Sequence, residues 1–528
     1  MLSRISMESD HDPSYTSQPC SPGEDTPLLS GPEDSDNSDG SHPVKQRLKS
    51  ESRDSLRLEL EILTRYCAPL VATYLLQYTY SVITTFVAGH LSADDLAAAS
   101  IGMTTMNIVG LDIFEGMATA LDTLCAHAYG SGHLVQVGLH VQCMLALMAL
   151  ALVPVGAVWI ASPWIFGALL TQPELALKAG SFLQVSLLGM PGYAAFEALK
   201  RFLQAQGDFT PGLVVLVICT PVNALLSWLF ALRLGLGLNG AALGAAVTND
   251  LRPLLLLIYI AFRRSSHACW GGFSREAFRY WRATLKLSLA GTAVNLAEWS
   301  AFEIATFSTS YISTRHLAAQ TILTTVSDVM WHIPFSVSVA ISTRIGHFIG
   351  AGLAGAARRV AKLYAVVFVA IGVFDGLLLL LLRRQLPALF TSDPSVQHLA
   401  ANSMLAVAGA QVVDAIICGC NGTLRGLGRQ DVAGWTVFGV NYLAAVPLAL
   451  WLELGSPHWG LDGVWIGLAA GMAVVGVIEC VFMATTRWDA CTGEVTSKGY
   501  EWRSSRRLSN VSVRPRLDSL RRPSSHRT

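Results

Sequence analysis

The sequence predicts an all-α membrane protein with twelve transmembrane helices, arranged as two parallel six-helix repeats. Composition supports this fold class: of 528 residues, 52% are hydrophobic and 14% are charged, with a mean hydropathy of +0.45, whereas soluble chains carry about 25% charged residues. Apolar stretches also recur at about 20 residues each, the length that crosses a hydrocarbon core of about 30 Å. Finally, the two halves of the chain resemble each other.

Twelve apolar stretches can be placed in order along the chain. Their predicted limits are 66–89, 96–121, 137–161, 180–204, 211–232, 240–262, 284–312, 317–345, 360–382, 396–424, 432–452 and 463–486. Several contain proline, which membrane helices tolerate when neighbouring helices satisfy the freed backbone groups. Basic residues precede the first span, follow the sixth and eighth spans and fill the C-terminal tail. Because Lys and Arg accumulate on the cytoplasmic side, we predict that both termini are cytoplasmic.

The polar ends divide the chain further. Residues 1–60 are rich in Ser, Pro, Asp and Glu and lack apolar periodicity, so we predict a disordered cytoplasmic tail. The remaining predicted domains are an N-lobe at 61–264, a basic cytoplasmic linker at 265–282, a C-lobe at 283–487 and a basic disordered tail at 488–528.

A short motif in the N-terminal tail bears on location. Glu24 stands four residues before the pair Leu28 and Leu29, a spacing that resembles an acidic dileucine sorting signal. The alternative is a chance leucine pair. The signal favours the vacuolar membrane, with the plasma membrane as the second location.

The internal repeat rests on motifs that return at a nearly constant offset. Tyr129–Gly132 returns as Ile349–Gly352, 220 residues later, and Phe202–Gly207 returns as Thr423–Gly428, 221 residues later. An offset of six helices keeps the topology of the two halves the same, so the repeat is parallel. Transporters place substrate and ion sites at the interface between such repeats, near the middle of the bilayer.

Several motifs occur in order between residues 60 and 490, among them Ala88–Leu91, Gly116–Cys125, Glu298–Glu303 and Gly422–Gln430. These stretches resemble the eukaryotic branch of the multidrug and toxic compound extrusion (MATE) family. The resemblance implies a V-shaped pair of six-helix lobes around a central cavity. It also implies an antiporter that exports organic, often cationic, compounds in exchange for protons or sodium ions.

Carboxylates inside the predicted spans are the first candidate site residues, because an ionised side chain at the centre of a membrane helix costs about 2.5–3.5 kcal/mol. Glu298 and Glu303 lie in the seventh span and Asp414 in the tenth. The resemblance implies that the matching positions hold coupling carboxylates. We expect Glu298 and Asp414 to face a shared cavity and to exchange a proton for a cationic substrate, with Glu303 in support. The alternative is that all three are structural hydrogen-bond formers.

A second group of residues could line a substrate cavity. Asn295 shares a helix face with Glu298, and Tyr78 and Trp299 could present π faces to an organic cation. Packing is the alternative role for each of these residues. The predicted cavity residues are Gln77, Tyr78, Asp112, Glu115, Asn295 and Trp299.

Other charged residues within the spans have structural interpretations. Glu197 precedes Lys200 and Arg201 by three and four residues, a spacing that favours a local ion pair. Asp250 and Arg252 could pair with each other or across helices.

The sequence therefore predicts a proton-coupled secondary antiporter and not an enzyme. A sodium-coupled exporter and a flippase for lipid-linked substrates are the alternatives, although the flippase would need a strongly basic cavity. The chain contains no GxxxxGK[ST] motif to support ATP-driven transport, and no convincing nucleophile or His–acid pair for a membrane-embedded enzyme.

The predicted binding partners follow from the predicted antiporter function. They are a small organic substrate and the lipid bilayer, with H⁺ as the coupling ion, Na⁺ as the alternative, and no cofactor or metal. Lys plus Arg and Asp plus Glu balance at 37 each, which disfavours nucleic-acid binding. We predict a monomer.

Overall fold

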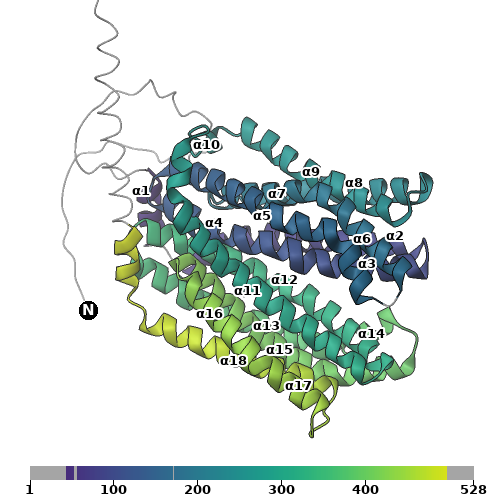
Figure 1. The fold of residues 1–528 in the computed structure, drawn as a ribbon. Helices are drawn as coiled ribbons and strands as arrows, with labels where there is room; N and C mark the ends of the chain where they lie inside the picture. Colours follow the sequence, from purple (N-terminus) through teal and green to yellow (C-terminus); the bar gives the residue numbers. More distant parts are fainter. Residues whose placement is uncertain (1–42, 53–55, 171, 496–528) are drawn as a thin grey trace, which may run out of the picture. The chain divides into compact units, whose positions relative to one another are not determined.

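A computed structural model describes residues 43–52, 56–170 and 172–495. In this part of the chain the regular structure is helical, with no strand (Figure 1). The predicted sorting residues Glu24, Leu28 and Leu29 lie outside the described residues, as do most of the two predicted tails.

The first half of the chain forms six spans, and two of them change helix type near the middle. Its elements are α2 (Leu56–Gly89), α3 (Ala93–Met106), the π-helical η1 (Asn107–Leu111), α4 (Asp112–Gly130), α5 (Leu134–Leu169), α6 (Pro173–Ser186), η2 (Leu187–Gly189), α7 (Met190–Gln204), α8 (Thr210–Trp228), η3 (Leu229–Arg233) and α9 (Gly237–Phe262). The second span is thus α3–η1–α4, and the fourth is α6–η2–α7.

The second half also forms six spans, which follow a link that contains two short helices. Its elements are α10 (Arg264–His267), η4 (Arg275–Tyr280), α11 (Trp281–Ser308), η5 (Thr309–Tyr311), α12 (Thr314–Gly350), α13 (Ala354–Leu382), α14 (Gln385–Phe390), α15 (Pro394–Leu427), α16 (Gln430–Val440), η6 (Asn441–Ala445), α17 (Val446–Leu454) and α18 (Leu461–Thr485). All twelve predicted spans coincide with helices, and the prediction of an all-α fold is confirmed.

Within the described residues, nine helical segments are long and apolar enough to cross a membrane on those criteria alone. The spans that do not qualify are α6–α7, α11 and α12. These helices carry ionisable side chains at membrane depth, including Glu197 and Lys200 in α7, Glu298 in α11, and Asp328 in α12. Their lower apolar content therefore marks the helices that build polar sites.

The lobes have apolar interiors and apolar outer surfaces. Trp159 and Phe196 are fully buried in the N-lobe, and Tyr364 and Trp465 in the C-lobe. Large apolar side chains on α5, α8, α13 and α18 are exposed instead. A continuous apolar surface of this kind is suited to contact with lipid.

The parts of the two predicted tails that lie next to the membrane spans are helical, although the sequence predicted disorder there. Residues 43–51 form helix α1 (Pro43–Glu51), and the chain is helical again at 488–495. Leu48, Trp488 and Cys491 are buried in an apolar cluster that includes residues of α2, α12 and α13. Contacts with the rest of the protein stabilise these short segments, and local composition does not reveal such contacts.

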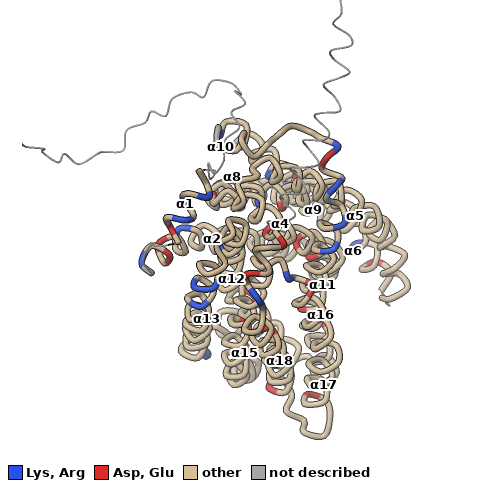
Figure 2. The backbone as a smooth tube through the Cα atoms, turned by 90° about the vertical axis from the view of Figure 1, so that its left-hand side faces the viewer, with Lys and Arg blue, Asp and Glu red and all other residues tan. Residues whose placement is uncertain are grey.

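The two lobes meet along α4, which packs on α11 and α12, and along α2, which packs on α12 (Figure 1). The end of the bundle near α1 and the start of α13 is called the basic end here, after its residues Arg47, Lys49, Arg358 and Lys362. Figure 2 looks onto this end and shows basic residues on α1 and α13.

Contacts between the lobes at the basic end are related by the internal repeat. The His127 Nε2 donates to the carbonyl oxygen of Gly426 at 2.7 Å, and the His347 Nε2 donates to that of Ala205 at 2.8 Å. The two histidines are 220 residues apart and the two acceptors 221. The lobes are therefore closed at the basic end by two equivalent hydrogen bonds.

Backbone contact is equally close at this point. A Cβ added to Gly130 would lie 2.2 Å from the carbonyl oxygen of His347, and one added to Gly350 would lie 2.3 Å from that of His127. Only glycine allows the two helices to approach so closely here.

Candidate functional site

A cavity of about 240 Å³ lies between the lobes and is lined by α2, η1, α4, α7 and α9 of the N-lobe and by α11 and α12 of the C-lobe. This volume lies just below the range of about 300–1,000 Å³ that is typical of small-molecule sites. Its lining on α2 begins at Tyr74 and extends to Thr84, away from the basic end. This space is called the central cavity below.

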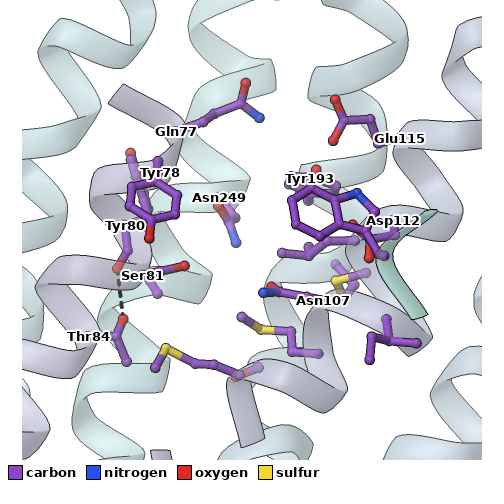
Figure 3. A pocket seen from close by; sticks show the side chains of 18 of the residues that line it. Gln77, Tyr78, Tyr80, Ser81, Thr84, Asn107, Asp112, Glu115, Tyr193 and Asn249 are labelled. Atoms are coloured by element: carbon purple, nitrogen blue, oxygen red, sulfur yellow. Dashed lines mark hydrogen bonds between the residues drawn. The ribbon is translucent and has the colours of Figure 1, made fainter. Parts of the chain in front are cut away.

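Polar and aromatic side chains from both lobes face the central cavity (Figure 3). In the view of Figure 3, Tyr78, Ser81 and Thr84 of α2 lie opposite Asp112 and Glu115 of α4. The C-lobe contributes Trp299, Glu303, Asp328, Trp331 and His332.

The structure thus brings most of the predicted cavity residues together. The predicted residues that line the central cavity are Gln77, Tyr78, Asp112, Glu115, Trp299 and Glu303. Asp328, whose role the sequence did not indicate, lies among them.

The amide of Gln77 is already engaged by a buried ion pair. Its Nε2 donates to Glu197 at 3.0 Å, and its Oε1 accepts from the Lys200 ammonium at 3.2 Å. Lys200 lies 2.7 Å from the Glu197 carboxylate. The ion pair that the spacing predicted is therefore formed between Glu197 and Lys200. Arg201 pairs with Asp122 instead, and its Nη1 lies 3.0 and 2.9 Å from the two carboxylate oxygens.

A second, smaller cavity of about 40 Å³ is lined mainly by the C-lobe residues Asn295, Glu298, Asn421 and Arg425, with Thr119 of α4 on the N-lobe side. The Asn421 Nδ2 is 3.4 Å from the Glu298 carboxylate. Within the described part of the chain, Glu298 forms no ion pair. This space is called the Glu298 cavity below.

Trp331 separates the two cavities, since its side chain lines both. It packs edge-on against Trp299 with ring centroids 5.5 Å apart, and it stacks on Phe335 at 4.4 Å. Tyr78 of the N-lobe contacts His332 at 5.6 Å, which extends the aromatic contacts across the lobe interface. An aromatic partition therefore lies between the substrate-sized cavity and Glu298.

Asp414 departs from the expected arrangement. The side chain is 8% exposed and lines neither the central cavity nor the Glu298 cavity. In this conformation Glu298 and Asp414 therefore do not meet in either of these two cavities, and the joint role of the two carboxylates stays a prediction. The two residues lie on different helices, and sequence spacing does not fix the rotation of one helix relative to another.

Two further buried carboxylates of the C-lobe were missed at the sequence level. Asp375 of α13 and Glu479 of α18 are both 0% exposed, and neither carboxylate has a hydrogen-bond partner among the described residues. Both lie inside predicted spans, so the rule that selected Glu298 would also have selected them. Within the described residues, no three His, Cys, Asp or Glu side chains meet as a metal site.

Comparison with known proteins identifies the family that has this architecture. A model of the MatE family matches the chain twice, at residues 69–229 and 292–451. The chain belongs to the MATE family. The two matches fall in the two halves of the chain, as expected of a parallel repeat.

Relatives occur in several kingdoms. The chain is 36% identical to an uncharacterized transporter of Schizosaccharomyces pombe over 82% of its own length and 80% of the relative's. It is 29% identical to Multidrug and toxin extrusion protein 1 of Xenopus tropicalis, over 84% and 77% of the two chains.

The fold also matches a solved structure. The eukaryotic MATE transporter AtDTX14 superposes with a TM-score of 0.80 at 24% identity, covering 84% of this chain and 100% of that one. This MATE protein is therefore a transporter with the two-lobe, twelve-helix fold of its family, and not an enzyme.

Proposed function

We propose that this MATE transporter exports organic, mainly cationic, compounds in exchange for protons, with Glu298 as a proton-binding residue. The observation that carries the proposal is the position of Glu298: it is half-buried beside Trp331, without an ion-pair partner within the described residues, in a cavity that Arg425 also lines. An ionised carboxylate buried in this way is costly, and a bound proton removes the cost.

The cation site is proposed in the central cavity. Asp112 and Glu115 on one lobe and Glu303 and Asp328 on the other supply negative charge there. The aromatic faces of Tyr78 and Trp299 supply favourable contacts for an organic cation. Asp414 is proposed to act with Glu298 in a conformation in which the C-lobe helices have rotated.

Arg425 offers a route from proton binding to lobe movement. Its side chain lines the Glu298 cavity and donates to Ser338, while its backbone carbonyl accepts from the Thr123 Oγ1 of the other lobe at 2.6 Å. When Glu298 becomes neutral, Arg425 loses a nearby negative charge. A shift of Arg425 would then weaken the contact that closes the basic end.

The energetics of this scheme are sufficient for uphill export. A proton moving down its gradient releases about 1.36 kcal/mol per pH unit. A membrane potential of 100 mV adds about 2.3 kcal/mol for each elementary charge.

The test uses the full chain in proteoliposomes and benzyltrimethylammonium, a permanent cation that cannot cross the lipid as a neutral base. An inside-acid pH gradient is expected to drive uptake, and collapsing the gradient is expected to abolish it. Glu298→Gln should reduce this uptake by about 10²-fold or more, since proton-transfer groups contribute about 10²–10⁴-fold. Glu453→Gln is the matched control, because Glu453 is a buried carboxylate of the same lobe that binds Ser308.

Uptake that persists without the pH gradient but depends on an imposed sodium gradient would show that the coupling ion is sodium and not the proton. Full proton-driven uptake by Glu298→Gln would remove Glu298 from the mechanism.

The location and orientation of the protein are part of the same proposal. We propose cytoplasmic termini, a basic end that faces the cytoplasm, a monomeric protein with lobes at 61–264 and 283–487, and residence in the vacuolar membrane. Replacing Leu28 and Leu29 by alanine in a fluorescently tagged chain should shift the protein to the plasma membrane. An unchanged distribution would leave the leucine pair without a sorting role.

A further inference from the structure

The N-lobe wall of the central cavity contains a buried arginine that has no counter-ion in the part of the chain that the structure describes. Arg252 of α9 lines the cavity and is 2% exposed. Three other buried basic side chains, Lys200, Arg201 and Arg344, each lie within 3 Å of a carboxylate oxygen. Buried Arg425 forms no ion pair within the described residues, but its guanidinium donates to Ser338. Arg252 forms no ion pair within the described residues, although the sequence had suggested Asp250 as its partner.

Aromatic rings hold Arg252 in place. Its guanidinium carbon is 3.7 Å from the centroid of the Tyr80 ring and 5.6 Å from that of Phe196. The Nε atom is buried and has no hydrogen-bond partner among the residues that the structure describes. Stacking on a ring fixes the plane of a guanidinium but does not neutralise its charge.

An uncompensated buried charge is costly, and the simplest compensation is an anionic group in the cavity. A guanidinium binds a carboxylate through two parallel N–H···O hydrogen bonds, which gives it directional selectivity for planar anions. Asn249, one helical turn before Arg252 on α9, points into the same space in Figure 3 and offers an amide donor.

The central cavity also contains negatively charged side chains, opposite in charge to Arg252. Glu303 and Asp328 on the C-lobe wall attract a cationic group, whereas Arg252 on the N-lobe wall attracts an anionic one. A purely cationic substrate would satisfy the carboxylates and leave Arg252 without a partner.

We propose that Arg252 is a carboxylate-binding subsite and that the preferred substrates of this transporter are zwitterions, with an ammonium group and a carboxylate on one small organic body. This inference rests on the proposed exporter function. It keeps the ammonium group that the proposed cation site binds and adds a carboxylate to the preferred substrate.

The test measures equilibrium binding to the purified full chain in nanodiscs without any ion gradient, so that it is independent of proton coupling. Two probes share an indole ring: tryptamine, a cation, and tryptophan, a zwitterion. Wild-type protein is expected to bind tryptophan more tightly than tryptamine. Arg252→Gln should weaken tryptophan binding by about tenfold or more, as expected for loss of a charge-assisted hydrogen bond, and should leave tryptamine binding intact or improved.

Arg252→Lys keeps the charge and should retain part of the preference for tryptophan. Arg233→Gln is the matched control, because Arg233 stacks on Trp228 at 5.1 Å but is exposed and outside the cavity. Tryptamine binding by Arg252→Gln shows that the variant is folded.

Two results would overturn the inference: tryptophan binding by the wild type that is no tighter than tryptamine binding, or an unchanged ratio of the two affinities in a folded Arg252→Gln protein. Neither depends on proton-driven uptake of benzyltrimethylammonium, which reports on the exporter function by itself.

Discussion

Lys200 illustrates how a charge is kept inside the N-lobe. Its ammonium is 1% exposed, lies 2.7 Å from Glu197 and 4.7 Å from the ring centroid of Tyr74, and donates to Gln77. Removing one member of a buried ion pair leaves the other charge without compensation, which is more damaging than removing both.

Lys200→Met is therefore expected to destabilise the protein by about 3–5 kcal/mol, because Glu197 remains buried and unpaired. Thermal unfolding of the purified protein in detergent measures the effect as a lower midpoint. The double variant Lys200→Met with Glu197→Gln should recover most of the loss. Lys286→Met is the control: Lys286 pairs with Asp431 at 3.0 Å, but its side chain is 70% exposed, and such pairs contribute about 0–1 kcal/mol. Equal destabilisation by Lys200→Met and Lys286→Met would contradict the prediction.

Single residues also show what the sequence could and could not predict about the site. The cost of charge in a membrane identified Glu298, Glu303 and Asp112 without a structure, and a spacing of three predicted the Glu197–Lys200 pair. The bond from Arg201 to Asp122 spans 79 positions, and no local pattern indicates it. The rotation of each helix about its axis decides such contacts.

Among the elements, α1 is the one whose existence depends most on its surroundings. It has nine residues, and isolated helices shorter than about 12–15 residues are marginal in water. Glu51 at its end contacts the Arg344 guanidinium of α12 at 2.6 Å, and Glu59 of α2 binds the same guanidinium. Arg344 thus connects α1, the N-lobe and the C-lobe.

The docking of α1 is expected to respond to acid through Glu51. Burial by itself raises the pKa of the Glu51 carboxyl, but hydrogen bonds and charge from Arg344 and Arg47 outweigh burial, so that the pKa lies below its ordinary value. A carboxyl with a lowered pKa stabilises the docked state above its unfolded pKa of about 4.3, and this contribution is lost as the pH falls through the lower, docked value.

A nitroxide label at the exposed position Lys49 measures this response by its mobility. The label should be immobile and unchanged between about pH 6 and pH 8, and it should become mobile below about pH 4. Glu51→Gln should be mobile already at neutral pH. A Glu51→Gln protein with the immobile spectrum of the wild type would show that Leu48 and the other apolar contacts suffice to hold α1.

The positions of the helices were predictable from local sequence, but their internal irregularities were not. Apolar runs located all twelve spans, but some helices are longer than predicted: α2 begins at Leu56 and not at 66, and α5 ends at Leu169 and not at 161. The π-helical turn η1 was not predicted, and it places Asn107, Ile108 and Leu111 on the central cavity. Turns of this kind are frequent at functional sites, but the sequence Asn107–Leu111 contains no proline, and its single glycine, Gly110, does not specify a π-helical turn.

At the scale of the whole molecule, closure of the basic end determines which side of the cavity is accessible. Gly130 and Gly350 allow the lobes to meet backbone to backbone. An exporter with alternating access must break this contact once in each cycle.

Gly130→Ala is expected to shift the population toward a conformation with the basic end open, because its Cβ would lie 2.2 Å from the carbonyl oxygen of His347. Distances between spin labels on Arg358 of the C-lobe and Arg263 of the N-lobe should lengthen. Gly355→Ala is the control, since nothing lies within 4 Å of the added Cβ. Distance distributions that are identical in the two variants would show that the backbone contact does not govern closure.

The paired hydrogen bonds of His127 and His347 have a consequence for the history of the fold. Each half of the chain presents the same histidine and the same carbonyl position to the other half, which is the pattern of an interface between two identical subunits related by a two-fold axis. A single ancestral six-helix chain could have met a second copy of itself through this surface. The modern protein would then be a fused homodimer, in which Arg252, Glu298 and other unmatched residues record how far the two subunits have since diverged.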